Sequence, residues 1–166
     1  QRPIVLLPRR PGGPVAGAVA PHLPDLGVLL AYTPLHLLLF GLPGDEPGPT
    51  ALVMTSGNLG GEPICFTDHD AVDRLGPLAD GWLMHDRAIL APCDDSVVRV
   101  CARRQIPIRR SRGYAPLPVA LPAPVPPTLA VGTDLKNTMA VAAGKYAWLS
   151  QHIGDMDDLA TLSAFD

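Results

Sequence analysis

The stretch from Pro116 to Pro127 limits most strongly how this chain can fold. Prolines stand at positions 116, 118, 122, 124, 126 and 127. Proline fixes its own backbone angle and lacks the N–H group that a helix or a sheet ladder needs. The stretch therefore predicts a semi-rigid extended spacer over residues 116–127 that joins no sheet. It divides the chain into a first domain at 1–115 and the start of a second at 128–166.

The overall composition is that of a globular protein with many turns. Hydrophobic residues make up 47% of the 166 residues, enough for a core, and 20 prolines with 16 glycines favour short helices. A formal charge of -3 does not fit a protein that coats nucleic acid or an anionic membrane. No apolar run reaches the roughly 18 to 20 residues of a membrane span, so we expect a cytoplasmic protein. The first residue is Gln1, and we expect a piece of a longer protein.

Short apolar runs separated by turn residues predict alternating strands and helices. Thr33 before Pro34, and Thr67 three residues before Asp70, are typical helix starts. The three cysteines form no CxxC pair and predict reduced thiols rather than a disulfide or a zinc site. Strands are predicted over 3–7, 27–32, 51–54, 81–87 and 97–100, a last segment over 106–112, helices over 15–20, 35–40 and after residue 67, and strands over 128–131, 139–143 and 146–150.

Four polar clusters follow or begin predicted strands: Ser56 with Asn58, His85 with Arg87, Asp94 to Ser96, and Arg109 to Arg112. Such positions are common ligand sites in open α/β sheets, and these residue types suit an anion or a nucleotide. The simpler alternatives are a turn that satisfies its own backbone and a solvated arginine face. A Ser56, His85 and Asp95 triad is disfavoured because Ser56 lacks the Gly-x-Ser-x-Gly elbow.

Two further features allow either a ligand role or an ordinary structural one. The turn from Gly132 to Thr138 offers a glycine, backbone amides and Lys136, which together can make an anion-binding concavity. An ordinary hairpin with Lys136 in solvent is the alternative. His36 could face a ligand or pack in the core as a lone histidine on an apolar helix.

Taken together, these motifs resemble the HypF-type carbamoyltransferases of hydrogenase maturation. The resemblance implies an α/β (α+β) fold, in which a YrdC-like twisted mixed sheet with helices precedes a short antiparallel β-meander from an incomplete actin-like domain. We do not find the family's acylphosphatase domain, its cysteine-rich zinc region or the basic strand that opens a YrdC-like domain. Zinc or iron sites are therefore expected only in the missing parts, and the fragment alone is expected to be inactive. The motifs that carry the resemblance are Met54 to Asn58 with Glu62 to Ile64, Ala79 to Arg87, Asp94 to Arg99, Arg109 to Tyr114, Val131 to Thr138 and Leu149 to Asp155.

The resemblance also implies a reaction. Carbamate released from carbamoyl phosphate would be adenylated with ATP and Mg²⁺, and the carbamoyl group passed to the C-terminal cysteine of the partner protein HypE. That product is a precursor of the cyanide ligands of nickel-iron hydrogenase. Neither a membrane nor a nucleic acid is expected as a partner. The alternatives are a threonylcarbamoyl-adenylate synthase for tRNA modification and a non-catalytic nucleotide- or RNA-binding module.

The same resemblance implies roles for named residues. Ser56 and Asn58 would contact the carbamoyl adenylate, and Arg110 and Arg112 its phosphates. Asp95 would orient an arginine or a metal, although no metal site is expected from this chain alone. The remaining residues implied at the nucleotide site are His85, Arg87, Pro34 and His36, and those of the second-domain phosphate loop are Gly132, Lys136, Asn137 and Thr138, with His152 and Asp155 nearby.

Overall fold

The computed structural model describes residues 1–165, which form two compact units. Unit 1 consists of Gln1–Thr55 and Asp95–Arg109, and unit 2 consists of Ser56–Asp94 and Arg110–Asp166. Each unit is therefore built from two separate segments of the chain. Among the described residues, no helix is both long enough and apolar enough to cross a membrane.

Unit 1 contains the mixed sheet that the sequence predicts. Its strands are β1 (Ile4–Pro8), β2 (Asp25–Val28), β3 (Val97–Cys101) and β4 (Arg104–Arg109), in the order β2-β1-β3-β4. The pairing of β1 with β3 is parallel, and the other two pairings are antiparallel. Val98 on β3 is 2% exposed, so the small core of the unit lies at this central strand.

Both predicted helix starts are confirmed, because caps are local features. In α1 (Pro34–Phe40) of unit 1, Thr33 Oγ1 accepts a hydrogen bond from His36 N at 3.1 Å. In α2 (Asp68–Leu75) of unit 2, Thr67 Oγ1 accepts from Asp70 N at 3.2 Å. A hydroxyl in this position satisfies an amide that has no partner within the helix. The remaining helices of unit 2 are the 3-10 turn η1 (Gly76–Leu78) and α3 (Leu159–Phe165).

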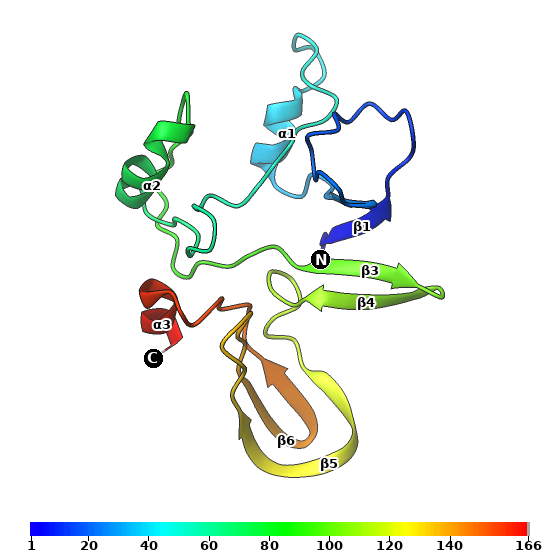
Figure 1. Cartoon of the computed structure of the whole chain (residues 1–166), viewed down its shortest axis with the longest axis vertical. Helices are drawn as coiled ribbons and strands as arrows, with labels where there is room; N and C mark the ends of the chain where they lie inside the picture. Colours follow the sequence, from blue (N-terminus) through cyan, green and yellow to red (C-terminus); the bar gives the residue numbers. More distant parts are fainter. Residues whose placement is uncertain (166) are drawn as a thin grey trace. The chain divides into compact units, whose positions relative to one another are not determined.

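The prediction that the proline stretch joins no sheet is wrong. Residues Val119–Ala130 form the long strand β5, which pairs antiparallel with β6 (Ala140–Leu149) (Figure 1). The register shifts twice, between Ala120 and Val125 and between Val125 and Thr128. Every proline of β5 falls in these two interruptions, where no ladder N–H is needed. An edge strand with bulges thus accommodates prolines that a regular central strand would exclude.

The predicted antiparallel arrangement of the tail is confirmed, with two strands in place of three. The strands predicted over 139–143 and 146–150 are one strand, β6, and Gly144 between them lies opposite Val125 with a left-handed φ of 58°. Such a residue makes a bulge within a strand and does not reverse the chain.

Three other local predictions are wrong. The segments 51–54 and 81–87 are irregular and exposed, and residues 15–20 form turns. Short apolar runs do not reveal whether a neighbouring strand is available to pair with them. The 15–20 run is also too short to sustain a helix by itself. The strands β2 and β4 begin two residues earlier than the sequence predicts.

Candidate functional site

The turn at Ser56 and Asn58 is held together by its own side chains. Ser56 Oγ donates to Asn58 Oδ1 at 2.5 Å. Asn58 Nδ2 donates to the carbonyl oxygens of Leu59 at 2.8 Å and Glu62 at 2.9 Å. The Asn58 amide group therefore shapes the loop from 58 to 62, as the simpler alternative predicts, while Ser56 remains exposed on its rim.

The same turn is fixed against α2. Cys65 N donates to Gly57 O at 2.7 Å, and a Cβ added to Gly57 would lie 3.5 Å from Leu75 Cδ1. Burial raises the pKa of the Cys65 thiol, which favours its neutral form. All three cysteines are free, as predicted. The Ser56 turn thus follows no strand, contrary to the prediction, but packing onto a helix still fixes its position.

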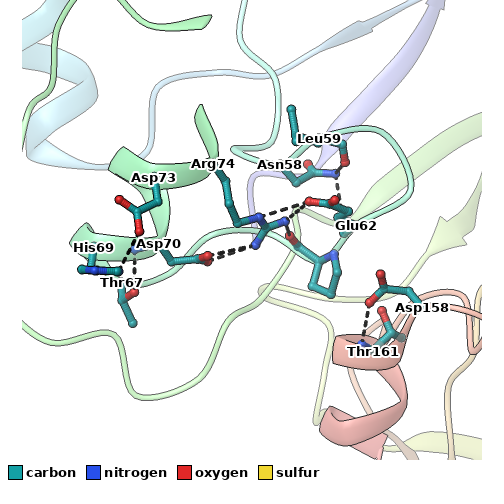
Figure 2. A network of polar contacts seen from close by, with 11 residues as sticks. Asn58, Leu59, Glu62, Thr67, His69, Asp70, Asp73, Arg74, Asp158 and Thr161 are labelled. Atoms are coloured by element: carbon teal, nitrogen blue, oxygen red, sulfur yellow. Dashed lines mark hydrogen bonds and ion pairs between the residues drawn. The ribbon is translucent and has the colours of Figure 1, made fainter. Parts of the chain in front are cut away.

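Arg74 at the end of α2 extends this arrangement, and sequence reasoning missed it. Its guanidinium lies between the carboxylates of Asp70 and Glu62 (Figure 2). Arg74 Nη1 donates to Asp70 Oδ2 at 3.0 Å, and Arg74 Nε donates to Glu62 Oε2 at 3.1 Å. The spacing of Asp70 and Arg74 by four residues on a helix is the one sequence signal that indicates this pair.

In unit 1, Tyr32 links two residues that the sequence named separately. His36 Nδ1 accepts from Tyr32 N at 3.4 Å, and the two rings meet edge to face with centroids 4.6 Å apart. Tyr32 Oη donates to Asp95 Oδ1 at 3.5 Å. The carbonyl oxygen of Asp95 accepts from Arg109 Nε at 2.9 Å. The bond to Arg109 thus comes from the backbone of Asp95 and not from its carboxylate. Pro34 is exposed at the first position of α1.

The arginine cluster is not a uniform solvated face. Arg110 Nη2 donates to the carbonyl oxygens of Tyr114 at 3.1 Å and Leu117 at 2.9 Å. These bonds stabilise the chain entering β5 and would compete with a phosphate. Arg112 is held through its backbone, since Arg112 N donates to Asp94 O at 3.0 Å, and its side chain is half-buried. Arg112 stays a candidate contact of a phosphate.

His85 and Arg87 lie in the exposed irregular segment that replaces the predicted strand at 81–87. No regular element fixes these side chains in place. Their assignment to the nucleotide site rests on the motif alone.

In the second-domain loop, Lys136 pairs with Asp155, although the Lys136 side chain is 72% exposed. Asp155 Oδ2 accepts from Lys136 Nζ and Asp155 Oδ1 from Lys136 N, both at 2.7 Å. The hydrogen bonds from Lys136 hold the pKa of the Asp155 carboxyl below its ordinary value. Asn137 N also donates to Gly154 O at 2.7 Å. The predicted proximity of Asp155 to the loop is confirmed.

Gly132 and Asn137 form the tightest part of this loop. A Cβ on Gly132 would lie 2.6 Å from both Asn137 Oδ1 and Thr138 O, so no larger residue fits there. Asn137 is 4% exposed, and its Oδ1 is buried without a hydrogen-bond partner. A buried acceptor in this state costs about 1–3 kcal/mol, so a donor from a ligand would relieve that cost.

A second group of side chains surrounds Asp94. His152 Nε2 lies 4.0 Å from Asp94 Oδ2, and Cys93 Sγ lies 3.2 Å from Ser111 Oγ. Ser111 is fully buried. Across residues 1–165, no cluster of three or more His, Cys, Asp and Glu side chains is arranged to hold a metal ion.

Comparison with known proteins places this arrangement in a family. A family model described as telomere recombination, that of the Sua5, YciO and YrdC proteins, matches residues 1–111. A model described as the HypF Kae1-like domain matches residues 123–166. The chain is 46% identical over 165 residues to carbamoyltransferase HypF of Synechocystis sp., covering 99% of this chain and 21% of that protein. The chain belongs to the HypF carbamoyltransferase family.

Other HypF proteins give the same result. The carbamoyltransferase HypF of Rhizobium leguminosarum is 47% identical over 159 residues, covering 95% of this chain and 21% of that protein. The crystal structure of full-length HypF in the phosphate- and nucleotide-bound form matches 99% of this chain and 25% of its own, with a TM-score of 0.83 and 40% identity. The crystal structure of T. kodakarensis HypF matches 99% of this chain and 21% of its own, with a TM-score of 0.86 and 36% identity. The chain thus spans about a fifth of the length of the curated relatives it matches.

Proposed function

We propose that this chain is a segment of an ATP-dependent carbamoyltransferase. In the proposed reaction, carbamate from carbamoyl phosphate is converted to carbamoyl adenylate, and the carbamoyl group passes to the C-terminal cysteine of HypE in nickel-iron hydrogenase maturation. The observation that carries the proposal is the match of 99% of the chain to a HypF structure in a phosphate- and nucleotide-bound form. We further propose a cytoplasmic location, and we expect the segment alone to lack the complete activity.

Within this reaction, we propose that Ser56, Asn58 and Arg112, all in unit 2, contact the adenylate. The exposed Ser56 hydroxyl donates its one proton to Asn58 and can accept a hydrogen bond from the amino group of a carbamoyl, and the Arg112 guanidinium suits a phosphate. We keep His85 and Arg87 as proposed contacts and regard Arg110 as a support for the loop. In unit 1, Pro34, His36 and Asp95 form the group that we propose to line a nucleotide.

The loop from Gly132 to Thr138 is the proposed phosphate loop of the second domain. The tight Gly132 position, where the backbone has no Cβ, supports a close approach of a phosphate to the loop. Mg²⁺ usually binds through one or two carboxylates together with the phosphates of its nucleotide, so we propose that it enters with ATP. We place the domain boundary within residues 116–127, close to residue 123, where the Kae1-like match begins.

A threonylcarbamoyl-adenylate synthase remains the alternative for the first domain, since the YrdC family model covers residues 1–111. The match of residues 123–166 to the HypF Kae1-like domain favours the carbamoyltransferase.

Arg112→Ala tests the proposed site in the full-length enzyme. We expect carbamoyl-phosphate-dependent pyrophosphate exchange to fall roughly 100-fold, because the lost group stabilises charge on the phosphates. The free energy of unfolding should change far less, by about 0.5 kcal/mol, because a half-buried side chain outside the core contributes little.

Arg103→Ala is the matched control, because Arg103 is an exposed arginine at the turn between β3 and β4. This variant should exchange pyrophosphate at the wild-type rate. Equal activity of the Arg112 and Arg103 variants would remove Arg112 from the site.

A further inference from the structure

Arg74 joins α2 to the loop that carries Asn58 (Figure 2). Besides its bonds to Asp70 and to Glu62 through Nε, Arg74 donates through Nη2 to the Glu62 carboxylate and, at 3.1 Å, to the carbonyl oxygen of Pro63. All three guanidinium nitrogens therefore donate to groups of the chain itself. One side chain thus connects the last turn of a helix to two consecutive residues of a loop.

These bonds argue against a direct role for Arg74 in binding a ligand. Its side chain is 27% exposed and lies between two carboxylates, Glu62 and Asp70, which together more than balance its charge. The hydrogen bonds that Arg74 donates to the Glu62 carboxylate raise the pKa of Arg74, so the guanidinium stays charged. An incoming phosphate would have to displace both carboxylates. The arginine consequently serves the protein's own structure.

The bonds continue from Arg74 to the candidate carbamoyl contacts. Arg74 binds the Glu62 side chain and the Pro63 carbonyl, while Asn58 Nδ2 binds the Glu62 carbonyl at 2.9 Å. The Glu62–Pro63 segment is therefore held from both sides. Asn58 Oδ1 in turn accepts from Ser56 Oγ, so the helix and the Ser56 hydroxyl belong to one connected network.

We propose that Arg74 is a positioning residue that holds the loop from Ser56 to Glu62 in the geometry that binds the carbamoyl group. This proposal rests on the proposed function of the same loop. A loop outside any helix or strand is placed accurately only if surrounding bonds fix it. Displacement of a substrate contact by about 1 Å can cost roughly 100-fold in rate.

Arg74→Gln in the full-length enzyme tests this proposal, with Asp73→Asn as the matched control. Asp73 lies on the same helix but pairs with His69 at 3.3 Å, and both side chains are largely exposed. Hydrogen exchange followed by mass spectrometry should show faster exchange of peptides from the 56–66 region only in Arg74→Gln. Pyrophosphate exchange should show kcat/KM for carbamoyl phosphate reduced about 10- to 100-fold in that variant, and unchanged in the control.

Arg74→Lys separates positioning from charge. A lysine keeps the positive charge, but its single nitrogen cannot contact Asp70, Glu62 and Pro63 together in the way the planar guanidinium does. We therefore expect this variant to recover only part of the activity and of the protection from exchange. If peptides from 97–101 exchange at the wild-type rate in a variant, that variant retains the folded sheet.

Two results would overturn the proposal. One is unchanged exchange of the 56–66 region in Arg74→Gln. The other is an Arg74→Gln variant whose 56–66 region exchanges faster while its activity stays at the wild-type level, provided that Asn58→Ala inactivates the same enzyme. Absence of pyrophosphate exchange in the wild-type enzyme would contradict the proposed function itself, and the exchange rates of the loop would then still decide whether Arg74 holds it.

Discussion

At the scale of single residues, Asp155 holds the proposed phosphate loop by binding Lys136 twice. Its two carboxylate oxygens accept from the Lys136 side chain and from the Lys136 amide. Lys136 adopts a left-handed φ of 55°, which costs a non-glycine residue about 1–2 kcal/mol. The bonds to Asp155 therefore help to keep the loop in a conformation that its own sequence disfavours.

We expect the Asp155 carboxyl to titrate below its ordinary pKa of 3.8. A pKa that is lower in the folded state means that the pair stabilises the loop above pH 3.8 and loses this effect as the pH falls through the lowered value. The loop should thus stay closed at neutral pH and open only in acid. Carboxyl NMR titration checks this expectation, and Lys136→Ala should return the pKa toward 3.8. An unshifted wild-type carboxyl would show that the pair does not form in solution.

Residue types and motif spacing could name Ser56, Asn58 and Arg112 as candidates, but they could not reveal Arg74. The partners of Arg74 include a carbonyl oxygen, whose position depends on the path of an irregular loop. The sequence likewise could not separate Arg110, which binds two carbonyl groups, from Arg112. Side chains that donate hydrogen bonds to backbone carbonyl oxygens have no recognisable spacing in a sequence.

At the scale of elements, local signals predicted helices better than strands. The caps Thr33 and Thr67 bond to amides three residues away, so a few neighbouring residues determine them. Strands depend on distant partners. The proline strand β5 forms because β6 is present and because the register shifts leave its prolines unpaired. The prolines alone therefore predicted the extended backbone correctly but missed the pairing.

Gly144→Ala tests the bulge in β6. A Cβ at Gly144 would meet no atom within 4 Å, so the only cost is the left-handed φ of 58°. We expect a loss of about 1 kcal/mol in the free energy of unfolding, measured by denaturant titration. Gly81→Ala is the control, because Gly81 also has open space around it but no left-handed backbone. Equal stability of the two variants would mean that β6 can shift its register and remove the bulge.

At the scale of the whole molecule, the order of motifs predicted the family, and the division into compact units could not be predicted. One unit joins residues 1–55 with 95–109, and the division falls between Asp94 and Asp95. Two adjacent acidic residues give no sign of such a boundary. It arises because β3 pairs with β1 across more than 80 residues of sequence, and long-range pairing of this kind has no local signal.

The hairpin of β5 and β6 should be less stable than the sheet of unit 1 when the 166-residue chain is studied alone. Two-stranded hairpins are marginal in water, and the apolar side chains of Leu129 and Val141 are 66% and 52% exposed. Val98 on β3, in contrast, is buried between two neighbouring strands. We therefore expect amides of β6 to exchange at least about tenfold faster than those of β3, a difference of about 1.4 kcal/mol in local stability.

Hydrogen exchange on the isolated chain and on a full-length HypF enzyme checks this expectation. The exchange of β6 should slow in the longer protein, where further parts of a Kae1-like domain can cover the exposed side chains. The exchange of β3 should change little between the two proteins, which makes it the internal reference. Val53 cannot serve as a second reference, because it is 75% exposed and lies outside any strand. If β6 is protected as strongly as β3 in the isolated chain, the hairpin is stable without further cover, and the domain boundary proposed within residues 116–127 is wrong.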